Sequence, residues 1–563
     1  MTQKYGSAKK ALEVYPIYFF RGYMKIYSFS PFGYEGALVS VEVDLRRGIP
    51  AIDIVGLADG AVKESRERMK SAIRNSGFEF PAERVLISLS PADLKKEGAG
   101  FDLAIALSVL NAKSLLSENK NCNDENWTIN NNINENDSVL VIGELELNGS
   151  VRPVKAIHAA VSTALNAGIT KCIVAEQNAR EAREVKGAKV FGASNLTEAF
   201  TALYNDSAFT TKETNEELFS YPKDSIVING IHFPPVTEEY DFIQIKNQKK
   251  LVRALQVAAA GRHNLLVFGP PGCGKTLSLQ RFISLLPYLT PEESHSVTRI
   301  HSIAGLLQRS SPLIRIPPFR MPHQTASIEG ICGGGPRCAP GEISLAHNGV
   351  LYLDEASEFR SSVLQMLRVP LENGMITLSR AGRSTVFPAQ FQLLISTNPC
   401  PCGNYGSKER ICLCSAKSVE MFWKKFSGPL LDRIDIRIHA DYNKNFSSEN
   451  DKAKDSDEGE AVTTSELRKE IAVAIDAQNK RQAKRNALLT PCEIEKYCAL
   501  NSECKEVLEK AVNKYDFSPR AEASCKKLAR TLSDMKGQKE ITLECLNEAI
   551  QLRSTPLGLD MNF

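Results

Sequence analysis

The feature that most constrains the fold of this chain is a glycine-rich loop between an apolar run and a helical pattern. The apolar run LLVF occupies residues 265–268, and the helix-like LSLQRF follows at 277–282. Strand, glycine-rich loop and helix in this order are the context of a phosphate-binding P-loop, because glycines let backbone N–H groups surround an anion. The loop consists of Gly269, Pro270, Pro271, Gly272, Cys273, Gly274, Lys275 and Thr276.

This loop predicts a site for ATP and Mg²⁺. Lys275 is expected to reach the β- and γ-phosphates, and the hydroxyl of Thr276 to bind Mg²⁺. The start of the following helix adds the positive end of its dipole. A plain glycine–proline turn is the alternative interpretation.

Two further strand ends predict the rest of the site. The apolar run GVLYL leads into Asp354 and Glu355. We expect Asp354 to hold Mg²⁺, directly or through water, and Glu355 to orient and deprotonate the attacking water. A second run, residues 391–396, leads to Asn398, whose amide is expected to position the same water. The alternatives are a solvated acidic turn and an asparagine that only ends a strand.

Composition narrows the classes of protein that this chain can belong to. Its 563 residues are enough for about three domains. The formal net charge of +3 gives no general argument for nucleic acid, so any DNA contact has to come from local patches. No apolar run reaches the roughly 18 residues of a membrane span, and 14 cysteines beside a P-loop indicate a reducing compartment. We therefore expect a cytoplasmic protein without a membrane partner.

Periodicity predicts an α/β protein with an N-terminal α/β domain, an ATPase core and a helical C-terminal region. Polar, acidic runs at 117–138 and 442–463 predict disordered insertions. The predicted boundaries are 1–23 for an extension, 24–203 for the N-terminal domain, 204–240 for a linker, 241–441 for the core with its cysteines at 400–414, 442–463 for an insertion and 464–563 for the lid.

Two segments of the core are expected at its surface. Three consecutive glycines at 333–335 have no place in a regular element and predict a mobile loop. Residues 374–388 predict a hairpin with Arg380 and Arg383 at its tip. Two arginines there can grip DNA phosphates, and a solvated tip is the alternative.

Two later arginines are expected to act on the γ-phosphate, the first of them across a subunit interface. Arg433 lies in SGPLLDRID after a helix, and we expect it to act as an arginine finger on the γ-phosphate of a neighbour. Arg520 starts a lid helix and is expected to contact the γ-phosphate, an ordinary surface arginine being the alternative. Four basic residues at 480–485 favour a solvated face over a DNA-binding stripe.

Four cysteines follow Asn398 with the spacing C-x-C-x9-C-x-C. Two thiolate pairs joined by a turn can close a tetrahedral Zn²⁺ site, so zinc is a third expected cofactor. Free thiols or redox pairing are the alternative. The four residues are Cys400, Cys402, Cys412 and Cys414.

The stretches HNLLVFGPPGCGKT, APGEISLAHNGVLYLDEASEF, LRVPLENGMITLSRAG, STNPCPCG and SGPLLDRIDI together resemble the magnesium-chelatase-like AAA+ ATPases, and among them the ComM/YifB proteins. The resemblance implies a homo-hexameric ring that hydrolyses ATP and acts on branched or single-stranded DNA. It further implies a core whose parallel sheet is flanked by helices, a C-terminal helical lid, and a branch-migration helicase of recombination and natural transformation. The triple-glycine loop at 333–335 and the arginine hairpin would then project into the ring pore. Gln324 departs from the family, where a second histidine is common, and so does Asn247, where glycine is usual.

The N-terminal domain resembles the proteolytic domain of Lon, in the version found in ComM/YifB proteins. Residues 56–107 and 143–157 carry this resemblance. It places Gly100 where Lon has its nucleophilic serine, so no hydroxyl is available there. The resemblance therefore implies a domain without protease activity that binds a partner or supports assembly. A cryptic protease that uses the nearby Ser90 and Lys96 is the alternative.

Two other functions are compatible with a ring ATPase of this kind. One is a magnesium-chelatase subunit, whose usual chain lacks the Lon-like domain and the cysteine cluster. The other is a protein-remodelling ATPase, whose pore loops are usually aromatic and hydrophobic. The hairpin tip here reads RAGR, which favours DNA.

Overall fold

The computed structural model places most of the chain, and the predicted extension at 1–23 lies outside the described residues. Most of the two predicted insertions and hairpin-tip residues 381 and 382 also lie outside them. The described residues are 24–57, 59–92, 94, 96, 98–120, 137–211, 220–245, 248–308, 313–336, 338–380, 383–405, 410–440 and 462–554.

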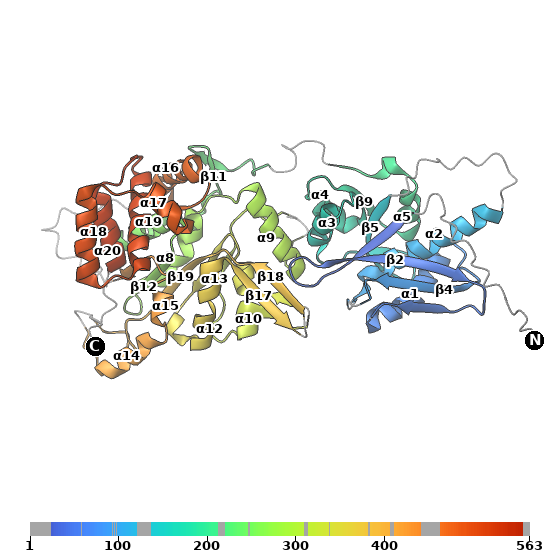
Figure 1. The fold of residues 1–563 in the computed structure, drawn as a ribbon, viewed down its shortest axis with the longest axis horizontal. Coiled ribbons are helices and arrows are strands. Elements are labelled where there is room, and N and C mark those ends of the chain that lie inside the picture. The colour runs from blue at the N-terminus through green and yellow to red at the C-terminus, as the bar shows by residue number, and fades with distance from the viewer. Residues whose placement is uncertain are drawn as a thin grey trace, which may run out of the picture.

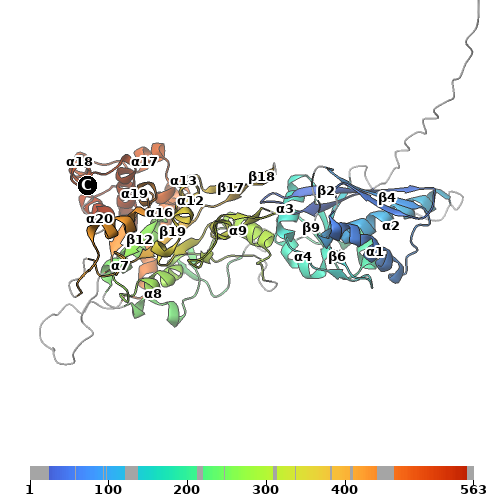
Figure 2. The same cartoon turned by 90° about the horizontal axis from the view of Figure 1, so that it is seen from below.

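The molecule is elongated, with the N-terminal domain at one end and the lid at the other (Figures 1 and 2). Helix α9 (Pro291–Ala304) and the hairpin of β17 (Met375–Arg380) and β18 (Arg383–Pro388) lie between the N-terminal domain and the rest of the ATPase. The hairpin confirms the prediction for 374–388. Within the described ranges, no helix combines the length and the hydropathy that crossing a bilayer requires.

The N-terminal domain is built on a mixed sheet of seven strands. β2 is antiparallel to both of its neighbours, β1 and β4. The pairs β1–β5, β5–β8 and β8–β9 are parallel. In order across the sheet, the strands are β3 (Ile52–Val55), β4 (Arg84–Ser90), β2 (Ala37–Arg46), β1 (Lys25–Ser30), β5 (Ser138–Ile142), β8 (Lys171–Ala175) and β9 (Lys189–Ala193).

Helices cover both faces of this sheet. Val139 and Val141 of β5 belong to a core with α1 (Gly60–Asn75), α2 (Asp102–Lys120) and α5 (Leu196–Leu203). Leu140 and Ile142 alternate with them and pack against α3 (Ile157–Asn166) and α4 (Glu176–Arg183) on the opposite face. Successive side chains of a strand point to opposite faces, so a sheet buried on both faces needs the continuous apolar run VLVI. A two-stranded ladder, β6 (Glu144–Leu145) with β7 (Val151–Arg152), has Asn148 and Gly149 in its connecting turn.

The ATPase core contains a sheet of five strands in which all neighbours are parallel. Leu265 and Val267 face the core that the sheet shares with α7 (Lys249–Gly261) and the lid, while Leu266 and Phe268 face the other side. The sheet has the predicted parallel form. Its order is β13 (Phe319–Arg320), β16 (Val350–Leu353), β19 (Gln392–Thr397), β12 (Leu265–Phe268) and β20 (Ile436–His439).

Short helices connect the strands, and a bundle of longer ones forms the lid (Figure 1). The lid packs on α7, and Arg253 of that helix is bonded to Glu470 and Glu548 of the lid at 2.8 Å each. The core helices are α8 (Lys275–Gln280), α10 (Ile328–Cys332), α11 (Glu342–Leu345), α12 (Ser361–Met366), α13 (Arg368–Asn373), α14 (Ala416–Lys424) and α15 (Gly428–Leu431). The lid helices are α16 (Thr464–Gln482), α17 (Pro491–Tyr497), α18 (Ser502–Tyr515), α19 (Pro519–Met535) and α20 (Leu543–Ser554).

The second half of the predicted linker packs against the ATPase. Residues 226–233 form a short hairpin of β10 (Ile226–Ile228) and β11 (Ile231–Phe233). Phe233 is fully buried in the core beside α7, and the guanidinium of Arg468 lies 5.0 Å from the centre of its ring. This buried aromatic residue helps to hold the segment on the core, although the segment has no periodicity that sequence inspection could detect.

The expectation that the triple glycine stays outside regular structure is wrong. Gly333 and Gly334 form β14, which pairs antiparallel with β15 (Ala339–Pro340). Gly333 has a φ of +96°, and a Cβ there would lie 2.5 Å from the carbonyl oxygen of Ala339. The ladder needs this close backbone approach, which glycine permits.

The N-terminal domain contacts α9 and the hairpin through the loop after β1. The guanidinium of Arg299 on α9 lies 4.6 Å from the ring centre of Tyr34 and donates to the Tyr34 carbonyl at 3.1 Å. The Tyr34 amide donates to the hydroxyl of Thr385 on β18 at 3.1 Å. Arg299 also pairs with Glu35 at 3.0 Å. The junction therefore joins the N-terminal domain to both ATPase elements.

Candidate active site

The glycine-rich loop connects β12 to α8 at the carboxyl edge of the parallel sheet. Gly272 and Gly274 have φ values of +84° and +83°, and the left-handed Gly274 is the residue from which α8 starts. A Cβ on Gly269 would lie 2.2 Å from the carbonyl oxygen of Ala440. Two glycines thus permit the turn and a third permits close packing on the segment after β20.

The ammonium group of Lys275 lies inside this loop. It donates to the carbonyls of Gly269 at 2.6 Å and Pro270 at 2.8 Å. Burial lowers the pKa of Lys275, and the charges of Asp354 and Glu355 oppose that shift. A cation enclosed by a loop at a helix start is the arrangement that binds phosphate oxygens.

Thr276, in the first turn of α8, lies beside Asp354, the residue that follows β16. The threonine hydroxyl is 3.2 Å from each carboxylate oxygen of Asp354. Tyr352 donates to Asp354 at 2.7 Å, and the Ser396 hydroxyl also bonds this carboxylate. A hydroxyl and a fixed carboxylate are hard oxygen ligands of the type that Mg²⁺ prefers.

Glu355 has a strained backbone and an exposed side chain. Its φ is +48°, in the left-handed region that non-glycine residues avoid. Its amide donates to the Ser396 hydroxyl at 3.1 Å, and Gln324 donates to its carboxylate at 2.8 Å. Such strain occurs at sites where a side chain must take a particular direction.

Asn398 follows β19, the strand between β12 and β16. Its amide oxygen accepts a hydrogen bond from Lys275 at 3.4 Å. The carboxyl ends of parallel strands meet at one edge, which brings Asn398 beside the loop and the two acids. The structure therefore gathers Lys275, Thr276, Asp354, Glu355 and Asn398 in one place.

Sequence inspection missed three side chains that hold these acids: Tyr352, Ser396 and Gln324. For Tyr352 and Ser396 the available signal was a polar side chain within a buried run, YL before Asp354 and ST before Asn398, whereas Gln324 lies outside such a run. Buried polar groups are bonded to a partner, and here the partners are the two acids.

Arg433 lies at the amino-terminal ends of the parallel strands, opposite the carboxyl ends where the P-loop lies. It precedes β20, whose first residue, Ile436, pairs with Leu265, the first residue of β12. Asn264, just before β12, donates to the Arg433 carbonyl at 2.9 Å. The four residues of a strand separate this edge from the P-loop by about 13 Å. Arg520 lies on this side too, since Arg433 and Arg520 both pair with Glu372. The predicted site residues thus form two groups at opposite edges.

The arginine hairpin is exposed, and the basic run of the lid is not a free surface. Arg380 has an exposed side chain and pairs in the ladder with Arg383. In the lid, Arg481 donates to Asp534 at 2.7 and 2.8 Å. Lys480 pairs with Asp476 at 2.7 Å and Lys484 with Glu493 at 2.5 Å. Three of the four basic residues at 480–485 are therefore paired with acids of the lid itself.

The four cysteines after Asn398 converge. Their sulfur atoms all lie within 4.8 Å of one another. The Sγ atoms of Cys400 and Cys402 are 3.4 Å apart. The Sγ atom of Cys412 lies 3.7 Å from that of Cys400 and 3.6 Å from that of Cys402. Tetrahedral zinc with Zn–S bonds of about 2.3 Å needs sulfur atoms about 3.8 Å apart. The donor set therefore fits a zinc ion.

This cysteine loop packs against the P-loop. A Cβ on Gly403, which has a φ of +78°, would lie 2.8 Å from Cδ of Pro271. Trp423 of α14 donates to the Pro399 carbonyl at 3.1 Å and makes an edge contact with Phe268 of β12, with ring centres 5.7 Å apart. The cysteine loop thus touches both the P-loop and the strand before it.

In the N-terminal domain, Gly100 lies in a short 3₁₀ turn at Ala99–Phe101. Lys96 is fully buried, and its ammonium group donates to the carbonyl of Pro91. Ser90 is the exposed last residue of β4.

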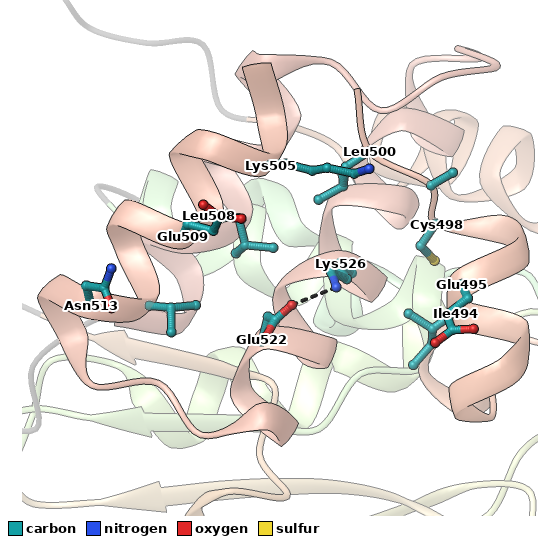
Figure 3. Close-up of a pocket in the computed structure, with 12 residues that line it drawn as sticks. Ile494, Glu495, Cys498, Leu500, Lys505, Leu508, Glu509, Asn513, Glu522 and Lys526 are labelled. Carbon is teal, nitrogen blue, oxygen red and sulfur yellow. Dashed lines mark ion pairs between the residues drawn. The ribbon is translucent and has the colours of Figure 1, made fainter. Parts of the chain in front are cut away.

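A cavity of about 650 Å³ lies in the lid and is separate from the nucleotide site. Residues of α17, α18 and α19 line it, including Lys505 and Lys526, together with Cys498 from the connection between α17 and α18 (Figure 3). Glu522 pairs with Lys526 at 2.7 Å on its wall. The lining contains no residue of the P-loop and neither of the acids that follow β16.

Three family models match the chain. "Magnesium chelatase, subunit ChlI" matches residues 241–447, "Subunit ChlI of Mg-chelatase" matches 41–178, and "Magnesium chelatase, subunit ChlI C-terminal" matches 461–553. The chain is 36% identical over 532 residues to competence protein ComM of Haemophilus influenzae. These residues cover 94% of this chain and 97% of that protein.

Two further relatives show the range of the similarity. The uncharacterized protein YifB of Escherichia coli is 35% identical over 523 residues, which cover 93% of this chain and 95% of YifB. The magnesium-chelatase 38 kDa subunit of Cereibacter sphaeroides is 25% identical over 176 residues, 28% of this chain and 53% of that subunit. The long matches include the N-terminal domain, whereas the chelatase match is confined to a part of the chain.

Proposed function

Because the chain belongs to the ComM/YifB family of magnesium-chelatase-like AAA+ ATPases, we propose that it is a ring-forming ATPase that moves on DNA. The observation that carries the proposal is the convergence of Lys275, Thr276, Asp354, Glu355 and Asn398 at one sheet edge. A lysine in a P-loop, a hydroxyl and two acids are the side chains that ATP hydrolysis with Mg²⁺ requires.

Each of these residues has one role in the proposed reaction. Lys275 binds phosphate oxygens, and Thr276 and Asp354 would hold Mg²⁺, which supplies charge neutralisation when bound. Glu355 and Asn398 orient a water molecule. As its oxygen bonds to the γ-phosphorus, its proton passes to Glu355 and the bond from the γ-phosphorus to the ADP oxygen breaks.

The location of Arg433 supports hydrolysis in trans. About 13 Å of strand lies between this arginine and the P-loop of the same chain. Arg433 and Arg520 therefore serve the nucleotide of a neighbouring subunit, and the repeated contact closes a homo-hexameric ring. Their fixed charges stabilise the transition state.

DNA is the proposed substrate, branched or single-stranded, and branch migration the proposed activity. Support comes from the exposed Arg380 on the β17–β18 hairpin, whose tip carries Arg383, and from a relative that is named a competence protein. Guanidinium groups bind phosphates without reading sequence, as a translocating motor requires.

Zinc is the proposed third cofactor. Cys400, Cys402, Cys412 and Cys414 would hold it, and its chemistry there is structural, because four thiolates leave no open position. Free thiols are the competing state.

We further propose that the N-terminal domain has a Lon-like fold without protease activity. Gly100 has no side chain to act as a nucleophile, and the ammonium of Lys96 is committed to a backbone carbonyl. The domain would then bind a partner or support assembly.

The test is ATP turnover measured in parallel with four-way DNA, a porphyrin and an unfolded protein. DNA is expected to raise turnover, and replacement of Arg380 and Arg383 by alanine to abolish the increase while basal turnover remains. Stimulation by porphyrin alone would indicate a chelatase subunit, and stimulation by unfolded protein alone a remodelling ATPase. Either result would refute DNA as the substrate.

A further inference from the structure

One carboxylate joins the two arginines that lie away from the P-loop. Glu372 on α13 accepts from Nη2 of Arg520 through Oε1 at 3.0 Å, and its Oε2 pairs with Nη2 of Arg433. Arg433 comes from the segment after α15, and Arg520 from the first turn of α19 in the lid. Three elements far apart in the sequence thus meet at a single acid.

The negative charge of Glu372 allows the guanidinium groups of Arg433 and Arg520 to lie close together. Two guanidinium groups close together repel each other, and an acid that bonds one with each oxygen offsets the repulsion. The same two arginines lower the pKa of Glu372, so that it stays ionised. The three side chains carry a combined charge of +1, which leaves the group attractive to an anion.

Exposure shows which side of the group can receive a ligand. The Arg433 side chain is only 11% exposed, and its Nη1 donates to the Pro429 carbonyl at 2.6 Å. Its Nε is buried and has no hydrogen-bond partner among the described residues. The side chains of Arg520 and Glu372 are 42% and 49% exposed. Arg433 is therefore held from within, and Arg520 is the more exposed of the two arginines.

We propose that Glu372 is a positioning residue for hydrolysis in trans, because it holds Arg433 and Arg520 as a pair that meets the nucleotide of the neighbouring subunit. The inference rests on the proposed function. Glu372 does not touch the nucleotide itself. Without its charge, the two guanidinium groups separate and no longer reach one phosphate together.

The first experiment is a kinetic comparison of the full chain with Glu372→Gln, which keeps the size of the side chain and removes its charge. The kcat of ATP hydrolysis should fall about 10- to 100-fold, the usual effect of a misplaced catalytic group. KM for ATP should stay within about twofold, because the P-loop of each subunit is unchanged. Glu544→Gln is the matched control, since Glu544 is an exposed lid acid paired with Lys536 at 2.8 Å. An unchanged kcat in Glu372→Gln overturns the inference.

The second experiment separates a positioning role from a folding defect. Glu372→Gln chains are mixed in equal amounts with Glu355→Gln chains before ATP is added. About a quarter of the interfaces in a random ring then combine an intact P-loop side with an intact arginine side. Turnover should recover to about a quarter of the wild-type rate, whereas each variant alone stays low.

A parallel mixture of Arg433→Ala and Glu355→Gln reports on the proposed function itself. If this control mixture recovers and the Glu372→Gln mixture does not, Glu372 does not act on the arginine side and the inference is wrong. If neither mixture recovers, hydrolysis is not completed in trans, and the inference falls together with the proposed function.

Discussion

The hydroxyl of Thr276 lies 3.2 Å from both carboxylate oxygens of Asp354, although the two residues are 78 positions apart in the chain. The contact forms because β12 and β16 end at the same edge of a parallel sheet, with only β19 between them. The side chains that would hold Mg²⁺ are thus positioned by strand order. The predictions below test how the surrounding residues keep this geometry.

Ser396→Ala is expected to slow hydrolysis without weakening ATP binding. The Ser396 hydroxyl bonds the carboxylate of Asp354 and accepts from the amide of Glu355 at 3.1 Å. Its loss leaves both acids less firmly held, so kcat should fall about tenfold while KM changes little. Ser533→Ala is the control, because Ser533 is a buried lid serine whose hydroxyl donates to the carbonyl of Ala529 in its own helix. Equal kcat values in the two variants would contradict a role for Ser396.

Gly403→Ala is expected to weaken nucleotide binding through the cysteine loop. The added methyl would lie 2.8 Å from Cδ of Pro271 and push the P-loop. Gly537→Ala is the matched control, because Gly537 has a similar φ of +68° but open space around it. Each replacement costs roughly 1–2 kcal/mol of backbone strain. Titration with a fluorescent ADP analogue should show about a tenfold loss of affinity for Gly403→Ala alone. The same affinity in both variants would show that the two loops are independent.

Cys412→Ser is expected to remove bound zinc and destabilise the core. The purified wild-type chain should contain about one zinc ion, measured by elemental analysis, because four thiolates complete the site. The variant should contain almost none and unfold at a lower temperature, since a structural metal contributes to folding. Cys492→Ser, an exposed cysteine outside the cluster, should keep the zinc. Wild-type protein without zinc would favour free thiols.

Arg299→Ala is expected to loosen the N-terminal domain from α9. The change removes the contact with the Tyr34 ring and the hydrogen bonds to Tyr34 and Glu35. Amide hydrogen exchange of residues 31–36 should become faster, because local opening then costs less free energy. Arg84→Ala removes an exposed pair with Asp53 inside the same domain and should leave that exchange unchanged. Unchanged exchange in Arg299→Ala would show that other contacts hold the junction.

The sequence was most informative where local chemistry demands particular residues. A P-loop needs its glycines and lysine in one short run, and Asp354 and Asn398 stand directly after apolar strands. Parallel strands then bring such residues to one edge, so the grouping of this site could be predicted. The 374–388 hairpin and the helical character of the C-terminal region followed from periodicity, whereas the parallel core sheet and the lid followed from the family resemblance.

Contacts between distant segments could not be predicted. Nothing near Glu372 indicates two partners from other elements, and Phe233 helps to hold its hairpin on the core without a repeating pattern. The strand at Gly333 was missed because glycine usually weakens a strand, whereas this ladder requires its missing side chain. In each case the decisive information is which backbone or charge lies opposite, and a single sequence does not contain it.

A parallel sheet has two unlike edges, and this chain carries its P-loop at one and Arg433 at the other. In the proposed assembly the contacts would be head-to-tail, with one subunit's arginines facing the next subunit's loop. In an open row of subunits, one loop and one arginine pair at the ends would have no partner subunit, whereas in a closed ring every loop would face an arginine pair. The sheet architecture would then favour a closed ring, because ATP turnover per subunit would be greatest when the row of subunits has no ends.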